Sequence, residues 1–290
     1  MDNKKKNILV VGGTGFIGSQ VIYQLLQNNE YEVYSFSRHK NSLCSSFVGN
    51  VMNKTTLDVV FKSIPIDVCL ILYGLKSVAD SSQISIYTEN DLEGMINILN
   101  VCLDNGGTKV VYLSSGVVYQ SGIKLTETSP TESNSLYSML KLTNENLLFW
   151  YKQHKNLNYV ILRIFNVCGF SSIGKVSNDV ISLILNRKKL DVYGIDYDTP
   201  DGTLIRDYIS VQDVANAIVC AIDYNNSDII NIGSGVGYSV LEIIEIIENI
   251  VGIKVELNFL NKREIDQPIL IADVAKAIKK LGWKPTKDLV

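Results

Sequence analysis

The chain has 290 residues, 46% of them hydrophobic, which is enough to bury the core of one large domain or of two unequal ones. Its 27 Lys and Arg residues against 30 Asp and Glu leave a net charge of −3, which speaks against a nucleic-acid-binding protein. The five cysteines are odd in number and scattered, and only two histidines are present, so we expect reduced thiols and no metal site.

The start of the sequence shows no targeting signal. The segment KKKN, residues 4–7, leads straight into an apolar strand, without the apolar stretch and cleavage site of a signal peptide. No apolar run is long enough to span a bilayer. We therefore expect a cytoplasmic protein that binds neither membranes nor nucleic acid.

Apolar strands alternate with helical patterns along the first 166 residues. The patterns predict strands at 7–13, 31–37, 67–74, 109–116 and 159–166, and helices at 18–28, 87–106 and 135–154. This alternation indicates an α/β fold with a doubly wound parallel sheet of the Rossmann type. After Asn166 the pattern becomes irregular, with a further helix at 239–251. We expect a dinucleotide-binding domain at 1–167 and a smaller C-terminal α/β substrate domain at 168–290, with some crossing back to the first.

The first functional motif is the glycine-rich segment GGTGFIG, residues 12–18. It follows a predicted strand and opens a predicted helix, which is the context that a phosphate-binding turn requires. Glycines would permit a tight turn and let the backbone approach a pyrophosphate at the helix N-terminus. A glycine-rich turn that only packs tightly is the alternative. The expected cofactor contacts are Gly12, Gly15, Phe16, Ile17 and Gly18.

The end of the second predicted strand bears on which dinucleotide binds. An acid there would bind both hydroxyls of the adenosine ribose and repel a 2′-phosphate, but this chain has Ser37 followed by Arg38. Ser37 removes that repulsion, and Arg38 can present a charge to the phosphate with His39 and Lys40 nearby, which favours NADP. Arg38 could instead cover the adenine of NAD, because a guanidinium stacks well without any phosphate.

The candidate catalytic residues are Ser115, Tyr137 and Lys141. Tyr137 and Lys141 are four residues apart and so share one face of a predicted helix. A nearby ammonium favours the phenolate, so Tyr137 could exchange a proton with a substrate hydroxyl. Ser115 ends a predicted strand, where open α/β sheets bind ligands, and could hydrogen-bond the same hydroxyl. An exposed Tyr and Lys without a role are the alternative, but the combination with the glycine turn predicts an active site.

By these motifs the chain is identified as a member of the extended short-chain dehydrogenase/reductase family. The segments GGTGFIG, SSGVVY, YSMLK, RIFNV and RDYISVQDVA come in that family's order over nearly the whole sequence. Three further stretches resemble its UDP-glucose (UDP-galactose) 4-epimerase branch, namely GLKSVADS, DYDTPDGTLIRDYI and NIGSGVGYSVLEII followed by REIDQP. The resemblance implies inversion at C4 of a UDP-hexose through a 4-keto sugar, a bound nicotinamide cofactor, usually NAD, and a homodimer formed through two helices.

The resemblance also implies a site for the UDP-sugar. Arg206 and Arg263 would grip the diphosphate, where a planar guanidinium can contact phosphate oxygens bidentately, and Asp266 would take the uridine ribose hydroxyls. The other implied contacts of the UDP-sugar are Lys76 at the diphosphate or sugar, Asn166 at a phosphate, and Asn178 and Tyr193 at the uridine. For each of them, a surface ion pair or a core polar contact is the alternative. Asn50, which stands in place of the Asp that usually meets the adenine, and Val51 are expected cofactor contacts.

Departures from the family pattern limit which of the family's reactions the chain could catalyse. Gly116 and Val117 stand where sugar-nucleotide dehydratases carry Asp and Glu, so elimination of water lacks an evident catalyst. Asp91 stands where the family has Asn near the cofactor. An NADPH-dependent reductase of a nucleotide-linked 4-keto-6-deoxy sugar would use the same Ser, Tyr and Lys and is the alternative enzyme. A non-catalytic redox sensor is a third possibility, although such proteins usually lose the Tyr–Lys pair.

Overall fold

The structure is a computed structural model that describes residues 4–74, 84–172, 174, 184, 186 and 189–287. Two predicted substrate contacts, Lys76 and Asn178, lie outside the described residues. Within the described ranges, no helix is long and apolar enough to cross a membrane. The same ranges contain no cluster of three or more His, Cys, Asp or Glu side chains that could hold a metal ion.

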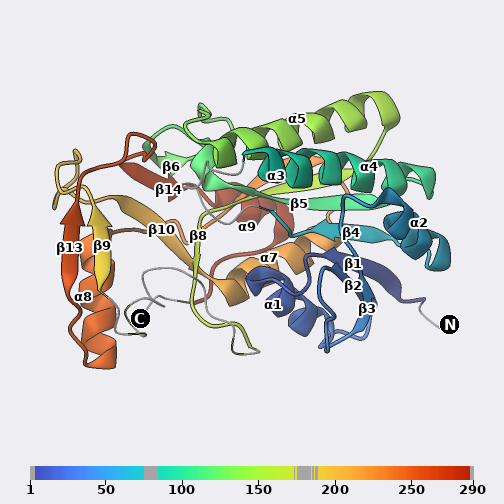
Figure 1. The fold of residues 1–290 in the computed structure, drawn as a ribbon, viewed down its shortest axis with the longest axis horizontal. Coiled ribbons are helices and arrows are strands. Elements are labelled where there is room, and N and C mark those ends of the chain that lie inside the picture. Colours follow the sequence, from blue (N-terminus) through green and yellow to red (C-terminus); the bar gives the residue numbers. More distant parts are fainter. Residues whose placement is uncertain are drawn as a thin grey trace.

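A seven-stranded parallel sheet forms the larger layer of the molecule (Figure 1). In spatial order its strands are β11 (Asp228–Ile232), β7 (Tyr159–Ile164), β5 (Lys109–Ser115), β4 (Val68–Ile71), β1 (Lys6–Val11), β2 (Tyr31–Ser37) and β3 (Ser45–Val48). The chain winds one way from β1 to β3 and the other way from β4 to β11, so the strand order reverses between β1 and β4. This confirms the predicted doubly wound parallel sheet.

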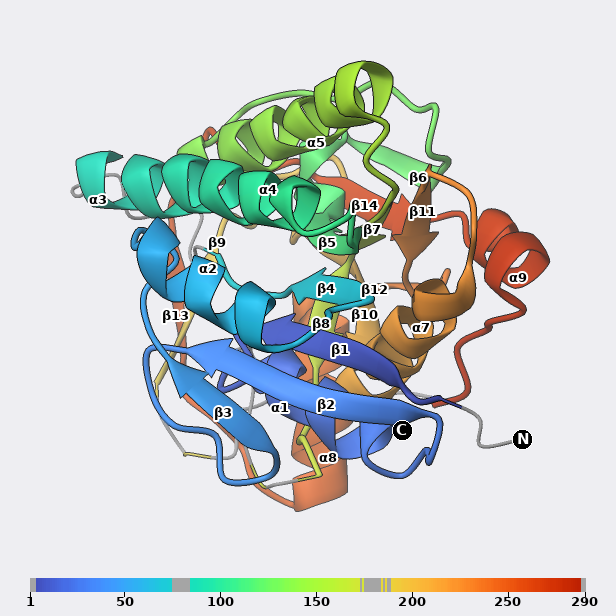
Figure 2. The same ribbon diagram turned by 90° about the vertical axis from the view of Figure 1, so that its right-hand side faces the viewer.

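Helices cover both faces of this sheet (Figure 2). The helices α1 (Phe16–Leu25) and α7 (Val211–Asp223) pack on one face, with α9 (Ala275–Leu281) beside α7. On the other face lie α2 (Lys54–Ser63), α4 (Gly94–Asp104) and α5 (Leu136–Lys155). Each face has its own apolar core, which explains why β4 reads VCLI with every residue buried.

Helix boundaries near the glycine motif and before α4 differ from the sequence prediction. Helix α1 begins at Phe16, because Gly15 is the extended residue that precedes it, and Gly18 lies in the first turn. The helix predicted over 87–106 consists of α3 (Ile84–Thr88), a π-helical turn η1 (Glu89–Glu93) and α4. The π-turn carries Asp91, which is buried.

The smaller unit is a mixed sheet with its own helix. Its strands are β12 (Gly237–Ser239), β10 (Ile205–Ser210), β14 (Ile269–Ala272) and β6 (Gly122–Leu125), with β8 (Asn166–Cys168) paired to β10. A parallel pair, β9 (Leu190–Tyr193) and β13 (Leu257–Leu260), lies beside α8 (Val240–Val251) at one end of the molecule (Figure 1). Helix α8 starts with a capping box between Ser239 and Glu242 and ends at Gly252, where φ is +67°.

The chain crosses between the two sheets in both directions. Strand β6 belongs to the smaller sheet but precedes residue 167, whereas β11 and α7 follow residue 167 and complete the larger unit. We propose 167/168 as the boundary along the sequence, with these crossings on either side of it. The exchange of strands links the C-terminal part of the chain to the larger sheet.

Candidate active site

The candidate residues of the larger sheet lie at one edge. Gly12 follows β1, Ser37 ends β2, Ser115 ends β5 and Asn166 comes two residues after β7. Because all these strands are parallel, their carboxyl ends meet at the same edge. Open α/β sheets bind ligands in the crevice outside this edge, next to the point where the strand order reverses.

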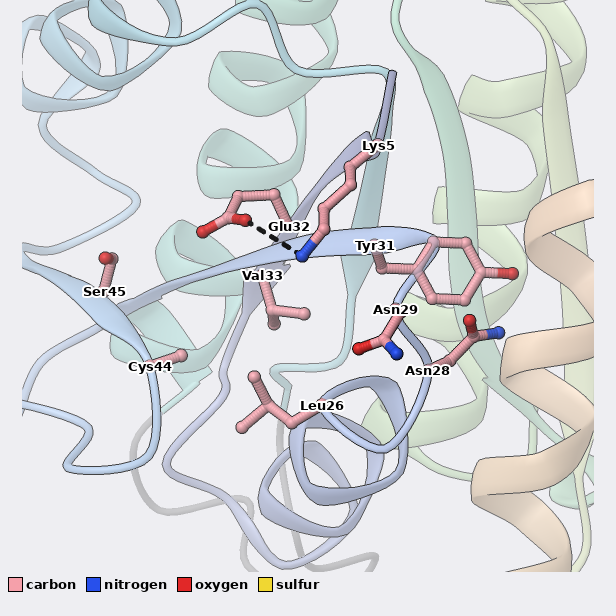
Figure 3. A pocket seen from close by; sticks show the side chains of 9 residues that line it. All are labelled: Lys5, Leu26, Asn28, Asn29, Tyr31, Glu32, Val33, Cys44 and Ser45. Atoms are coloured by element: carbon pink, nitrogen blue, oxygen red, sulfur yellow. Dashed lines mark ion pairs between the residues drawn. The ribbon is translucent and has the colours of Figure 1, made fainter. Parts of the chain in front are cut away.

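A shallow pocket at the opposite edge is separate from this site (Figure 3). It has a volume of about 250 Å³ and is lined by residues at the amino ends of the strands, among them Lys5 before β1, Glu32 in β2 and Ser45 in β3. Lys5 and Glu32 form a long ion pair of 3.9 Å across it, and both side chains are about half exposed. None of the predicted site residues that the structure describes lines this pocket, so we take the carboxyl edge as the candidate site.

The glycine turn is shaped for close approach of a ligand. Gly12 has φ +90°, and a Cβ atom at Gly18 would lie 2.3 Å from the Gly12 carbonyl oxygen, so a side chain fits at neither position. Gly15 at the N-cap of α1 offers no side chain to the first backbone N–H groups of Phe16 and Ile17. Free N–H groups and the positive end of the helix dipole together bind anions. The turn thus fits the pyrophosphate of a dinucleotide.

The residues after β2 stand beside this turn. The Ser37 hydroxyl accepts a hydrogen bond from the Thr14 backbone N–H at 3.2 Å, so it fixes the glycine turn from within. Arg38, His39 and Lys40 are exposed. A pocket of about 310 Å³ lies between the start of α1 and the segment after β2, and its lining includes Thr14, His39 and Lys40.

The two predicted adenine contacts follow β3 at the same edge. Asn50 is exposed, and its side-chain oxygen accepts a hydrogen bond from the Met52 backbone N–H at 3.1 Å. Val51 is buried and belongs to the apolar core on the α4 face. Asn50 is therefore accessible to a ligand, whereas the Val51 side chain is part of the core.

Lys141 is buried on α5, one helical turn after Tyr137. Its ammonium donates a hydrogen bond to the Leu113 carbonyl oxygen at 2.8 Å and lies 5.6 Å from the centre of the Tyr137 ring and 4.9 Å from that of Tyr112. Burial opposes the charge, yet the two tyrosines and the Asp91 carboxylate raise the pKa of Lys141 above the ordinary lysine value. The side chain is therefore an ammonium at neutral pH, and its charge lies close to the Tyr137 ring.

Asp91 adds a negative charge to this group. A Cβ atom at Gly74 would lie 3.2 Å from both the Asp91 Oδ1 and the Lys141 Nζ, so the two side chains converge on the end of β4. Asp91 is 5% exposed. The carboxylate helps to keep the buried Lys141 protonated.

Ser115 occupies the strand end that faces α5. Its hydroxyl accepts a hydrogen bond from the Val117 N–H at 3.3 Å and so caps the short 3₁₀ turn η2 (Gly116–Val118). Ser115 and Tyr137 are both partly exposed, as residues that meet a substrate must be. A side chain at Gly116 would begin 3.0 Å from the Phe165 ring, which gives a steric reason for glycine where dehydratases have an acid.

A cationic cluster lies in the smaller unit, formed by residues of β9 and β10 and of the segment between β13 and β14. The Arg263 guanidinium binds the Asp266 carboxylate bidentately at 2.7 and 3.1 Å and stacks on the Tyr193 ring with its central carbon 4.4 Å from the ring centre. Arg206 on β10 is partly buried, and burial lowers its pKa while Asp266 opposes that shift. An arginine stays charged even so. The structure brings these four predicted substrate contacts together.

Asn166 connects the two groups of candidates. It is exposed and begins β8, where it pairs with Tyr208 of β10, two residues beyond Arg206. The same residue follows β7 of the large sheet. It therefore stands between the carboxyl edge and the cationic cluster.

Sequence reasoning missed the polar residues that join these parts. Gln267, next to Asp266, donates from its buried amide to the carbonyl oxygens of Val117 and Tyr119 at 3.2 and 3.1 Å. These carbonyls lie just after Ser115, so the amide links the segment of Arg263 and Asp266 to the loop that follows Ser115. No sequence motif marks a side chain whose partners are distant backbone atoms. The buried pair Glu145 and Arg163 was also missed, because its two side chains come from elements 18 residues apart that meet only in the fold.

Comparisons with known proteins show the family of this chain. The model of the NAD dependent epimerase/dehydratase family matches residues 8–233. The chain belongs to this family. The UDP-glucose 4-epimerase of Streptococcus mutans serotype c is 31% identical over 307 residues, which cover 97% of this chain and 92% of the relative.

Solved structures of family members have the same fold. UDP-glucose 4-epimerase from Bifidobacterium longum in complex with NAD+ and UDP matches with a TM-score of 0.89 and 30% identity, covering 98% of this chain and 94% of that one. UDP-glucuronic acid 4-epimerase from Bacillus cereus in complex with UDP-glucuronic acid and NAD gives 0.86 and 26%, covering 98% and 95%. The cofactor in both is NAD, so the expectation of NADP gains no support from these relatives.

Proposed function

We propose that the protein is a UDP-hexose 4-epimerase that interconverts UDP-glucose and UDP-galactose. The observation that carries the proposal is the buried Lys141 ammonium beside Tyr137, on a helix that faces Ser115 at the ligand-binding edge. The glycine turn on one side and the arginine cluster on the other fit a dinucleotide and a sugar diphosphate. Family members with 4-epimerase activity support the same reaction.

In this proposal, the protein handles one proton at O4 of the sugar. The bound nicotinamide cofactor supplies reversible hydride transfer at C4. Tyr137 accepts the O4 proton as the sugar becomes a 4-keto sugar, and the Lys141 ammonium stabilises the phenolate. Ser115 donates a hydrogen bond to the same oxygen. Tyr137 returns the proton after the sugar has presented its other face.

The diphosphate must stay bound while the hexose turns. We assign this anchoring to Arg206 and Arg263, whose planar guanidinium groups suit phosphate oxygens. The bidentate ion pair with Asp266 and the stacking on Tyr193 hold the Arg263 guanidinium in one orientation. An anchor of this kind needs no contact with C4, so it leaves the hexose free to rotate.

The first test is turnover of UDP-glucose and UDP-galactose by the purified protein without added nucleotide. Tyr137→Phe should lower kcat by about 10²–10⁴-fold, because it removes the group that takes the O4 proton. Tyr151→Phe is the matched control, since Tyr151 lies on the same helix and its hydroxyl binds Asn100 at 2.8 Å, away from the site. Turnover only of a 4-keto sugar with added reduced cofactor would establish the reductase instead.

For the cofactor we propose NAD, held by the glycine turn, with the exposed Arg38 covering the adenine. Denatured protein should release NAD, identified by mass spectrometry. Gly18→Ala should purify without dinucleotide, because the new methyl group would lie 2.3 Å from the Gly12 carbonyl oxygen. Tyr23→Ala, on the exposed side of α1, should keep it. Release of NADP, with Arg38→Ala weakening NADP far more than NAD, would contradict the proposal.

We also propose a homodimer formed through α4 and α5. These helices lie side by side (Figures 1 and 2) and are joined by the Tyr151–Asn100 hydrogen bond. Their outer faces expose Met139 and Trp150, three turns apart on α5, and Ile96 on α4, at 43%, 48% and 38%. Asn146 is also exposed on this face of α5, between Met139 and Trp150. Exposed apolar side chains on two neighbouring helices suit a second copy of the same helices.

Sedimentation should show a dimer for the wild-type protein and a monomer for Trp150→Glu. The variant places a charge among the exposed apolar side chains of α4 and α5. Ile278→Glu is the control, since Ile278 on α9 is equally exposed, at 49%, but lies elsewhere. A wild-type protein that sediments as a monomer, or a Trp150→Glu variant that stays dimeric, would contradict this assignment.

A further inference from the structure

A buried ion pair lies directly behind the candidate catalytic residues. Glu145 is on α5, four residues after Lys141, and Arg163 is on β7; their exposed fractions are 1% and 4%. The Arg163 Nε donates to one carboxylate oxygen of Glu145 at 3.0 Å, and Nη2 donates to the other at 2.6 Å. The two planar groups are therefore locked in a bidentate geometry.

The same carboxylate has a third partner on the strand that carries Ser115. The Ser114 hydroxyl donates to Oε1 of Glu145 at 2.5 Å, and Ser114 immediately precedes Ser115 in β5. One side chain of α5 thus binds two neighbouring strands of the sheet. Tyr137 and Lys141 lie on α5 at eight and four residues before Glu145, on the same face of the helix.

Stability alone does not explain this pair. Taking two charges out of water is costly, and a well-packed apolar pair of similar volume often stabilises a fold as well or better. Apolar contacts between a helix and a sheet tolerate small shifts, whereas a bidentate pair with a further hydrogen bond has one favourable arrangement. Arg163 is itself fixed, since Nη1 donates to the Glu127 carbonyl oxygen at 3.3 Å and the guanidinium stacks on Tyr119.

We propose that Glu145 and Arg163 are positioning residues that set the distance between Ser115 and Tyr137. The proposal rests on the proposed function, because both residues act only through the pair that shares the O4 hydrogen bond. Glu145 fixes the position of α5 relative to β5 in the direction of the strand. Arg163 holds the Glu145 carboxylate in place. A misplacement of about 1 Å can lower a catalysed rate by about 10²-fold.

The test is the double variant Glu145→Leu/Arg163→Met, which removes both charges and keeps the volume nearly constant. We expect its Tm to equal or exceed that of the wild type, its kcat to fall by about 10²-fold, and its KM for the UDP-hexose to stay unchanged, because the arginine cluster is intact. The control is Glu248→Gln/Lys254→Met, which removes another ion pair, of 2.6 Å, far away at the end of α8. If the pair has only a structural role, a double variant that keeps the wild-type Tm should also keep the wild-type kcat. That result would overturn the proposal.

A second variant covers the case in which the double variant does not fold. Ser114→Ala removes only the link to β5 and leaves the ion pair in place. We expect kcat to fall by up to about 10²-fold, because α5 can then shift along β5, with KM unchanged and Tm lowered by a few degrees from the lost hydrogen bond. An unchanged kcat in Ser114→Ala would overturn the proposal.

Failure of the proposed function can be told apart from failure of the positioning role. A wild-type protein that turns over no UDP-hexose refutes the function only. In that case, amide hydrogen exchange of the peptide 136–145 decides the positioning role without any substrate. Faster exchange in the folded double variant than in the wild type supports it, and equal exchange overturns it.

Discussion

The parallel arrangement of the large sheet is the constraint on which the candidate site depends. Because all seven strands point the same way, the segments that follow β1, β2, β5 and β7 must emerge at one edge. Four stretches far apart in sequence thereby become neighbours. The glycine turn, Ser37, Ser115 and Asn166 each need only to stand at or just after the end of a strand to line the same edge.

The other half of the site comes from elements that cross this edge. Helix α5 presents Tyr137 and Lys141 to Ser115, and β8 runs from the end of β7 to pair with β10, the strand of Arg206. Gln267 then joins the Arg263–Asp266 segment to the loop after Ser115. The proposed reacting residues and the proposed anchoring residues thus belong to one connected framework, although they come from different sheets.

Local sequence patterns allowed most of the candidate site to be predicted. The features that the prediction missed depend on contacts between residues far apart in the sequence. The glycine turn, the strand end at Ser115 and the Tyr137–Lys141 spacing are each readable within a few residues, so they could be predicted. The short strands after residue 167, three to six residues long, have too little periodicity to be recognised. Glu145 and Arg163 look like ordinary surface charges until β5, β7 and α5 pack together and bury them. Ser37 was predicted from the missing acid at the end of β2, whereas the hydrogen bond that its hydroxyl accepts from the Thr14 N–H could not be read from the sequence.

The fate of the hydrogen at C4 is the most direct measure of the proposed reaction. UDP-galactose carrying deuterium at C4 would be incubated with the enzyme in ordinary water, and the UDP-glucose formed would be analysed by NMR. We expect the product to keep its deuterium at C4, because Tyr137 exchanges only the O4 proton while the hydrogen of C4 leaves and returns as hydride. Loss of the deuterium to water would contradict a hydride-shuttling 4-epimerase.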